Sequence, residues 1–127
     1  MGRKPSATLT DGELKLIRVL WKQGPATVGA IVESLTGRSA PAYNTVLTMM
    51  RILERKGYVK HRKEGRAFVF EALVDEARAR HSALRYMLDR FFNNSPGTLV
   101  LSLLEHEEVP DEELQQLRIL IHQYEAR

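Results

Sequence analysis

A short helical stretch of this sequence carries polar side chains of the kind that read DNA. Residues 42–56 have a helical pattern, and one face of that helix is polar. Asparagine can pair with adenine, threonine methyl groups can contact thymine methyl groups, and arginine can reach guanine or phosphate. The polar residues of this face are Asn44, Thr45, Thr48, Arg51 and, one turn further on, Arg55. We interpret them as the contact face of a recognition helix.

Each of these residues also has an ordinary structural explanation. The polar face of an amphipathic helix is usually only solvated. Tyr43 stands at the start of the helix, where it can contact a phosphate or a base edge, or pack the helix entry against the core. The segment that follows the helix favours the DNA interpretation.

Basic residues crowd the segment directly after the helix. Residues 58–63 and 66–72 are short runs rich in Val, Phe and Tyr, and Glu64-Gly65 separates them, which predicts a β-hairpin. Such a hairpin can lie against the phosphate backbone, where each neutralised phosphate adds affinity and salt sensitivity. The predicted phosphate contacts are Arg55, Lys60, Arg62, Lys63 and Arg66, with Arg3 and Lys4 reaching an adjacent phosphate from an N-terminal arm. His61 lies in the same hairpin.

Two further helices must support this surface. The first begins at Thr10, whose side chain can form a capping box with Glu13, and it ends at Gly24. The second begins at Thr27 and continues to Leu35. Three short helices and a basic hairpin predict a winged helix-turn-helix domain over residues 1–73.

The remainder, residues 74–127, is purely helical in pattern and differs in charge. Residues 1–72 hold 13 Lys and Arg against 6 Asp and Glu, whereas residues 73–127 hold 6 against 10. Three predicted helices form this second domain, and so short a segment cannot readily bury a core of its own. We therefore expect a mainly α protein with a helical dimerisation domain. The predicted contact residues of the dimer are Leu84, Leu88, Phe91, Leu99, Leu103, Leu114, Leu117 and Ile121.

Composition excludes several classes of site. The chain has no cysteine, which excludes disulfides and thiolate chemistry and fits a reducing cytoplasm. No apolar run reaches the length of a membrane span, and no secretory signal is present, so we expect no direct membrane association. No enzymatic motif stands out, and the four histidines form no ligand pair. We expect no catalytic residue, metal or cofactor.

Together these motifs resemble the penicillinase and methicillin-resistance repressor family. The resemblance runs from about Leu9 to Tyr124 and is most specific in "YNTVLTMMRILERKG", "EGRAFVF" and the "DRFF", "SP" and "LV" pieces further on. It implies a cytoplasmic homodimeric transcriptional repressor that binds a palindromic double-stranded DNA operator. It also implies a membrane sensor-protease as a partner, which inactivates the repressor by cutting an Asn-Phe bond. Ser102-Leu103 occupies that position here, so the cleavage site is not carried over.

Two other functions remain open at this point. The winged helix could be a protein-protein interaction module whose basic hairpin meets an acidic partner. The chain could also be a ligand-sensing regulator with an effector site at the dimer junction.

Overall fold

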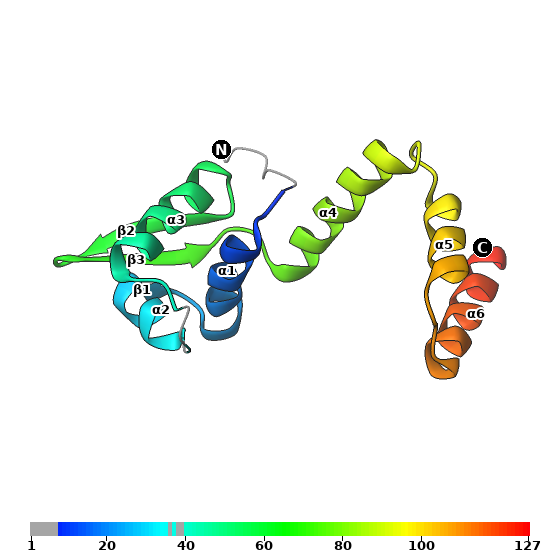
Figure 1. The fold of residues 1–127 in the computed structure, drawn as a ribbon, viewed down its shortest axis with the longest axis horizontal. Helices are drawn as coiled ribbons and strands as arrows, with labels where there is room; N and C mark the ends of the chain where they lie inside the picture. The colour runs from blue at the N-terminus through cyan, green and yellow to red at the C-terminus, as the bar shows by residue number, and fades with distance from the viewer. Residues whose placement is uncertain (1–7, 36, 38–39) are drawn as a thin grey trace. The chain divides into compact units, whose positions relative to one another are not determined.

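The computed structural model describes residues 8–35, 37 and 40–127, and it confirms a mainly helical winged helix-turn-helix protein (Figure 1). The elements of the first half are α1 (Asp11–Gln23), β1 (Ala26–Thr27), α2 (Val28–Ser34), α3 (Tyr43–Arg55), β2 (Val59–Glu64) and β3 (Ala67–Ala72). Three more helices follow, α4 (Glu76–Phe91), α5 (Pro96–His106) and α6 (Asp111–Glu125).

The predicted capping residues set the starts of the first two helices. The Thr10 hydroxyl accepts a hydrogen bond from the Glu13 N–H at 3.1 Å, and the Thr10 N–H donates to the Glu13 carboxylate at 2.9 Å. This capping box satisfies two amide groups that the helix itself leaves unpaired. Thr27 caps α2 in the same manner, accepting from the Ala30 N–H at 3.0 Å. The local sequence therefore defines where both helices begin.

A tight turn at Gly57 joins α3 to the hairpin. Gly57 has a φ of 93°, in the left-handed region that glycine adopts without steric cost. Its N–H donates to the Glu54 carbonyl at 3.1 Å, and the Tyr58 N–H donates to the Leu53 carbonyl at 3.0 Å. These two bonds form a Schellman motif, which ends the helix and starts β2 two residues later.

The sheet has three antiparallel strands in the order β1-β3-β2. We refer to the β2–β3 hairpin as the wing. Glu64 pairs with Ala67, so the loop at its tip is Gly65-Arg66, one residue later than predicted. Gly65 has a φ of 60°, which places glycine at the first loop position. The two-residue strand β1 was not predicted, because its pairing with β3 leaves no periodic signal in so short a segment.

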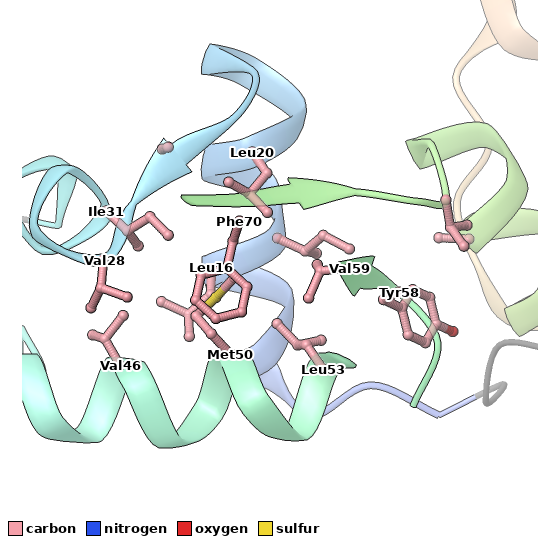
Figure 2. Packing of buried hydrophobic residues seen from close by; sticks show 14 residues of the cluster. Leu16, Leu20, Val28, Ile31, Val46, Met50, Leu53, Tyr58, Val59 and Phe70 are labelled. Atoms are coloured by element: carbon pink, nitrogen blue, oxygen red, sulfur yellow. The ribbon is translucent and has the colours of Figure 1, made fainter. Parts of the chain in front are cut away.

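The core of the first half lies between the three helices and the sheet. Figure 2 shows Val46, Met50 and Leu53 of α3 pointing into the cluster that contains Phe70 of β3 and Leu16 of α1. All five residues are essentially inaccessible to solvent, and each contributes about 1.5–3 kcal/mol of transfer free energy. This packing fixes one side of α3 and leaves its other side exposed.

Trp21 connects this core to the segment that precedes α4. Its indole N–H donates to the Val74 carbonyl at 2.8 Å, and the Trp21 ring is only partly buried. Leu14 is likewise only partly buried, whereas Leu16 lies fully in the core.

The chain divides into two compact units, residues 1–86 and residues 87–127. The division falls inside α4, whereas the predicted boundary lies after residue 73, where the sequence pattern becomes purely helical. Ala79 of α4 accordingly packs into the core of the first unit. In the second unit, the Ser95 hydroxyl caps α5 by accepting from the Thr98 N–H at 3.2 Å. The chain reverses direction between α5 and α6 (Figure 1).

The second unit has almost no interior. Among residues 87–127, all of which the structure describes, only Leu88 is buried. Neither α5 nor α6 contains a buried residue, although both carry many large apolar side chains. Throughout the described residues, no helix is long and apolar enough to cross a membrane.

Candidate nucleic-acid interface

The polar face of α3 is exposed, as the sequence predicted. Tyr43 is 50% exposed at the start of the helix, so it is not packed into the core. The opposite side of the helix is anchored by Val46, Met50 and Leu53, each 0% exposed. The predicted contact residues Tyr43, Asn44, Thr45, Thr48, Arg51 and Arg55 all belong to the exposed class. The helix thus presents a polar surface on a rigid support.

The wing has two faces with different charge. Residues that pair directly across two antiparallel strands share a face of the sheet. His61 pairs with Phe70 and Lys63 pairs with Phe68, so all four lie on the face that meets the core and α3. Lys60 pairs with Glu71 and therefore lies on the opposite face, which it shares with Arg62.

Carboxylates neutralise the basic residues on that opposite face. The Lys60 Nζ lies 3.4 Å from a Glu71 oxygen, and the Arg62 Nη1 lies 3.6 Å from the same atom. The Arg62 Nε also donates to Glu64 at 2.9 Å. Exposed pairs of this kind add little stability, but they reduce the net positive charge of the face. Of the predicted phosphate contacts, Lys60 and Arg62 are therefore already engaged with acidic residues.

The predicted DNA-contacting cations that form no ion pair among the described residues lie on α3 and near the tip of the wing. Within the described part of the chain, Arg51, Lys63 and Arg66 form no ion pair. Arg51 belongs to α3, Lys63 lies on the face of the wing that meets α3, and Arg66 is in the loop. Arg3 and Lys4 lie outside the described residues.

His61 and Glu54 connect the wing to α3. The His61 Nδ1 lies 2.7 Å and 2.8 Å from the two Glu54 carboxylate oxygens. The His61 ring also meets Phe68 edge-on and Phe70 at a tilt, with ring centroids 5.5 Å apart in both pairs. Together with Arg51 and Arg55, the pair lines a hollow of about 570 Å³. The Glu54–His61 contact could not be predicted from residue types, because it depends on how the Gly57 turn aligns β2 with α3.

A second ion pair supports the C-terminal end of α3. The Lys56 Nζ lies 2.7 Å from the Glu13 Oε1 and also donates to the Thr8 carbonyl at 3.3 Å. Glu13 is 3% exposed. Burial alone raises the pKa of Glu13, but hydrogen bonds from Lys56 and from the Thr10 N–H lower the pKa further than burial raises it. This buried charge was not predicted, because a helix N-terminus and its dipole already explain an acidic residue at that position.

The predicted dimer residues differ in exposure. Leu84, Phe91, Leu103 and Ile121 are exposed, whereas Leu99, Leu114 and Leu117 are half-buried. Leu88 is 7% exposed, so it is buried within its own chain and does not contribute to an exposed apolar surface. Other exposed apolar residues of α5 and α6 were not chosen from the sequence, and these are Val100, Leu101, Leu104, Ile119, Leu120 and Tyr124. Apolar residues occur on more than one side of these helices, so the predicted set of contact residues was incomplete.

The chain is similar to known repressors along most of its length. The sequence profile described as "Penicillinase repressor" matches residues 9–123. The penicillinase repressor of Bacillus licheniformis is 29% identical over 119 residues, which cover 94% of this chain and 93% of that protein. The methicillin resistance regulatory protein MecI of Staphylococcus aureus (strain N315) is 20% identical over 114 residues, covering 90% and 93% of the two chains. A solution structure of the DNA-binding domain of the repressor BlaI has 32% identity and a TM-score of 0.52, and the match covers 61% of this chain and 93% of that domain.

Proposed function

This chain belongs to the penicillinase repressor family, and we propose that it represses transcription as a homodimer bound to a palindromic operator. As a member of this family it is a DNA-binding transcriptional repressor. We propose in addition that the operator is palindromic, that the repressor is a homodimer and that the predicted residues contact the DNA. In this proposal α3 enters the major groove, and the wing grips the adjacent phosphates.

The exposed polar face of α3 beside a cationic wing carries this assignment. Asn44, Thr45 and Thr48 supply groups that can distinguish bases, and Arg51 supplies a cation on the same helix. Lys63 and Arg66 are exposed cations near or in the wing tip. Tyr43 is half exposed, which favours contact with DNA over packing of the helix entry. Phosphate contacts position such a domain, and base contacts give it specificity.

The lack of an interior in residues 87–127 supports the homodimer. Leu101 is 59% exposed and Leu120 is 62% exposed, and neither helix that carries them buries any residue. Large exposed apolar patches mark interaction surfaces in soluble proteins. A symmetric pair of these helices would cover the apolar side chains and hold two winged helices for two matching half-sites.

We also propose that an inducing signal releases the repressor from its operator through a membrane sensor-protease. Ser102-Leu103, which takes the place of the family's Asn-Phe bond, lies within α5, and Leu103 is 50% exposed. A protease needs extended backbone, so a cut there would require local unfolding of α5. A protein-protein interaction module and a ligand-sensing regulator are not favoured, since the relatives that match nearly the whole chain are repressors.

Mobility shifts with duplexes selected from a random-sequence pool test the proposal. We expect selection to recover inverted repeats, and we expect binding to weaken steeply between low and moderate salt, because Lys and Arg displace counterions from phosphate. An unselected duplex of the same length is the control. Recovery of no preferred sequence, or binding that is insensitive to salt, would contradict the proposal.

A further inference from the structure

Glu54 places a carboxylate on the surface that we propose to bind phosphate. It belongs to the last turns of α3, between Arg51 and Arg55 in the sequence, and its side chain is 32% exposed. A phosphate that approaches this part of α3 meets a like charge, which repels it unless a cation neutralises the carboxylate. The Nδ1 of His61 is in contact with both carboxylate oxygens, at 2.7 Å and 2.8 Å.

These groups line the hollow of about 570 Å³ between α3 and β2. The charged and titratable groups that line it are Arg51, Glu54 and Arg55 of α3 and His61 of β2. Lys63 lies on the same face of β2 as His61. The aromatic rings of β3 that contact His61 bring no charge, and the acidic residues of the wing, Glu64 and Glu71, belong to its other face.

The charge of the hollow depends on one proton. A neutral His61 can donate its Nδ1 proton to Glu54, which leaves the pair with a net negative charge. A protonated His61 makes the pair neutral and adds an N–H donor at Nε2. Protonation therefore removes the repulsion between Glu54 and an incoming anion, and the anion then meets the positive charge of Arg51.

We propose that this hollow holds a phosphate of the DNA backbone, and that His61 takes up a proton when the phosphate binds. The inference rests on the proposed function, since it assumes that α3 and the wing lie against DNA. Binding and protonation are linked, so a ligand that favours the imidazolium form binds more tightly as pH falls. His61 is then a positioning residue, because it acts through Glu54 and through the placement of the wing.

Fluorescence anisotropy with a labelled duplex, recovered from a random-sequence pool by the wild-type chain, tests this inference. At constant salt we expect wild-type affinity to rise about tenfold as pH falls from about 8 to about 5.5, because binding takes up a proton. His61→Gln should show little pH dependence. Glu54→Gln should bind more tightly than wild type at the higher pH, because the carboxylate is gone while the His61 ring still packs on Phe68 and Phe70.

His106→Gln is a matched control. His106 lies on α5, where its Nδ1 contacts the Ser102 carbonyl at 2.8 Å, and we expect this variant to keep the wild-type pH dependence. Full pH dependence in His61→Gln, or no gain in affinity for Glu54→Gln at the higher pH, would overturn the inference. If His61→Gln melts below the assay temperature, the affinity of Glu54→Gln at the higher pH alone tests the inference. Absence of wild-type binding at every pH would instead overturn the proposed function, and the inference with it.

Discussion

The ammonium group of Lys56 lies 2.7 Å from the carboxylate of Glu13, and this contact joins the end of α3 to the first turn of α1. The Glu13 side chain is 5% exposed and that of Lys56 is 26% exposed. Because Glu13 also completes the capping box with Thr10, one buried carboxylate connects the start of α1 with the end of the helix that carries the candidate DNA surface.

Removal of the Lys56 charge should destabilise the first unit. We expect Lys56→Met to lower the free energy of unfolding by about 2 kcal/mol, because the buried Glu13 carboxylate loses its charged hydrogen-bond donor. Urea denaturation measures this change. Lys22→Met is the control, since Lys22 is an exposed residue in the last turn of α1. An equal effect of both substitutions would mean that the Lys56–Glu13 contact adds no stability.

The Glu13 carboxylate should also make the stability of the first unit depend on pH in the acidic range. Its pKa is lowered in the folded chain, so its stabilising contribution is present above the unfolded pKa, about 4.3, and is lost as pH falls through the folded value. We expect the Tm to fall below about pH 4.5, and to fall less steeply in Glu13→Gln. Thermal melts between about pH 6 and about pH 3 measure both slopes. Parallel curves for the two proteins would contradict this assignment.

Asn44 and Lys63 should affect binding in different ways. We expect Asn44→Ala to reduce the preference for the selected operator over other duplexes, by about 1–3 kcal/mol at the position it reads. Lys63→Ala should weaken binding to all sequences alike and reduce the salt slope by about one. Competition binding with the selected and unselected duplexes separates the two effects. Equal loss of specificity in both variants would refute the proposed division between base and phosphate contacts.

The basic residues on the two faces of the wing should differ in importance. Lys60 and Arg62 are paired with Glu71, whereas Lys63 has no ion pair among the described residues. We therefore expect Lys60→Ala to weaken DNA binding less than Lys63→Ala. Glu71→Gln should strengthen binding, since Lys60 loses its acidic partner and Arg62 keeps only Glu64. Titrations at a single low salt concentration compare the three variants. A larger loss for Lys60→Ala would mean that the opposite face of the wing meets the DNA.

A charge on the exposed apolar surface of α6 should prevent dimerisation. Ile121 is 53% exposed, so Ile121→Glu is tolerated in the isolated chain but would bury a charge in a dimer contact. We expect this variant to sediment as a monomer and to bind the full operator far more weakly. Gln116→Glu, at an exposed polar position of the same helix, should remain a dimer. A dimeric Ile121→Glu variant would place the contact elsewhere.

The fold of the first unit could be predicted because its signals are local. Thr10, Thr27 and Gly57 mark helix ends by their own side chains or backbone freedom, and the apolar residues of α3 recur at helical spacing. The exposed face of α3 followed from the same spacing. The exposed polar face, which is the candidate DNA surface, could therefore be predicted from the sequence as the complement of the buried residues.

The parts that could not be predicted depend on contacts between distant segments. β1 exists only because Ala26 and Thr27 pair with Phe70 and Val69, more than 40 residues away. The neutralisation of Lys60 by Glu71 depends on the strand register, which shifted with the position of the loop. The Glu13–Lys56 pair likewise spans 43 residues. Such pairings leave no periodic pattern, so residue type alone could not reveal them.

Neither α5 nor α6 buries a residue within its own chain, so we expect the stability of residues 87–127 to depend on the concentration of the protein. If two copies bury these helices together as proposed, the folded form of the second unit depends on protomer concentration, as in obligate homodimers. The concentration of dimers then falls faster than the total concentration of chains when the protein is diluted. A modest fall in concentration, by proteolysis or by dilution as a cell grows, would thus release an operator more sharply than it would for a repressor that binds as a monomer.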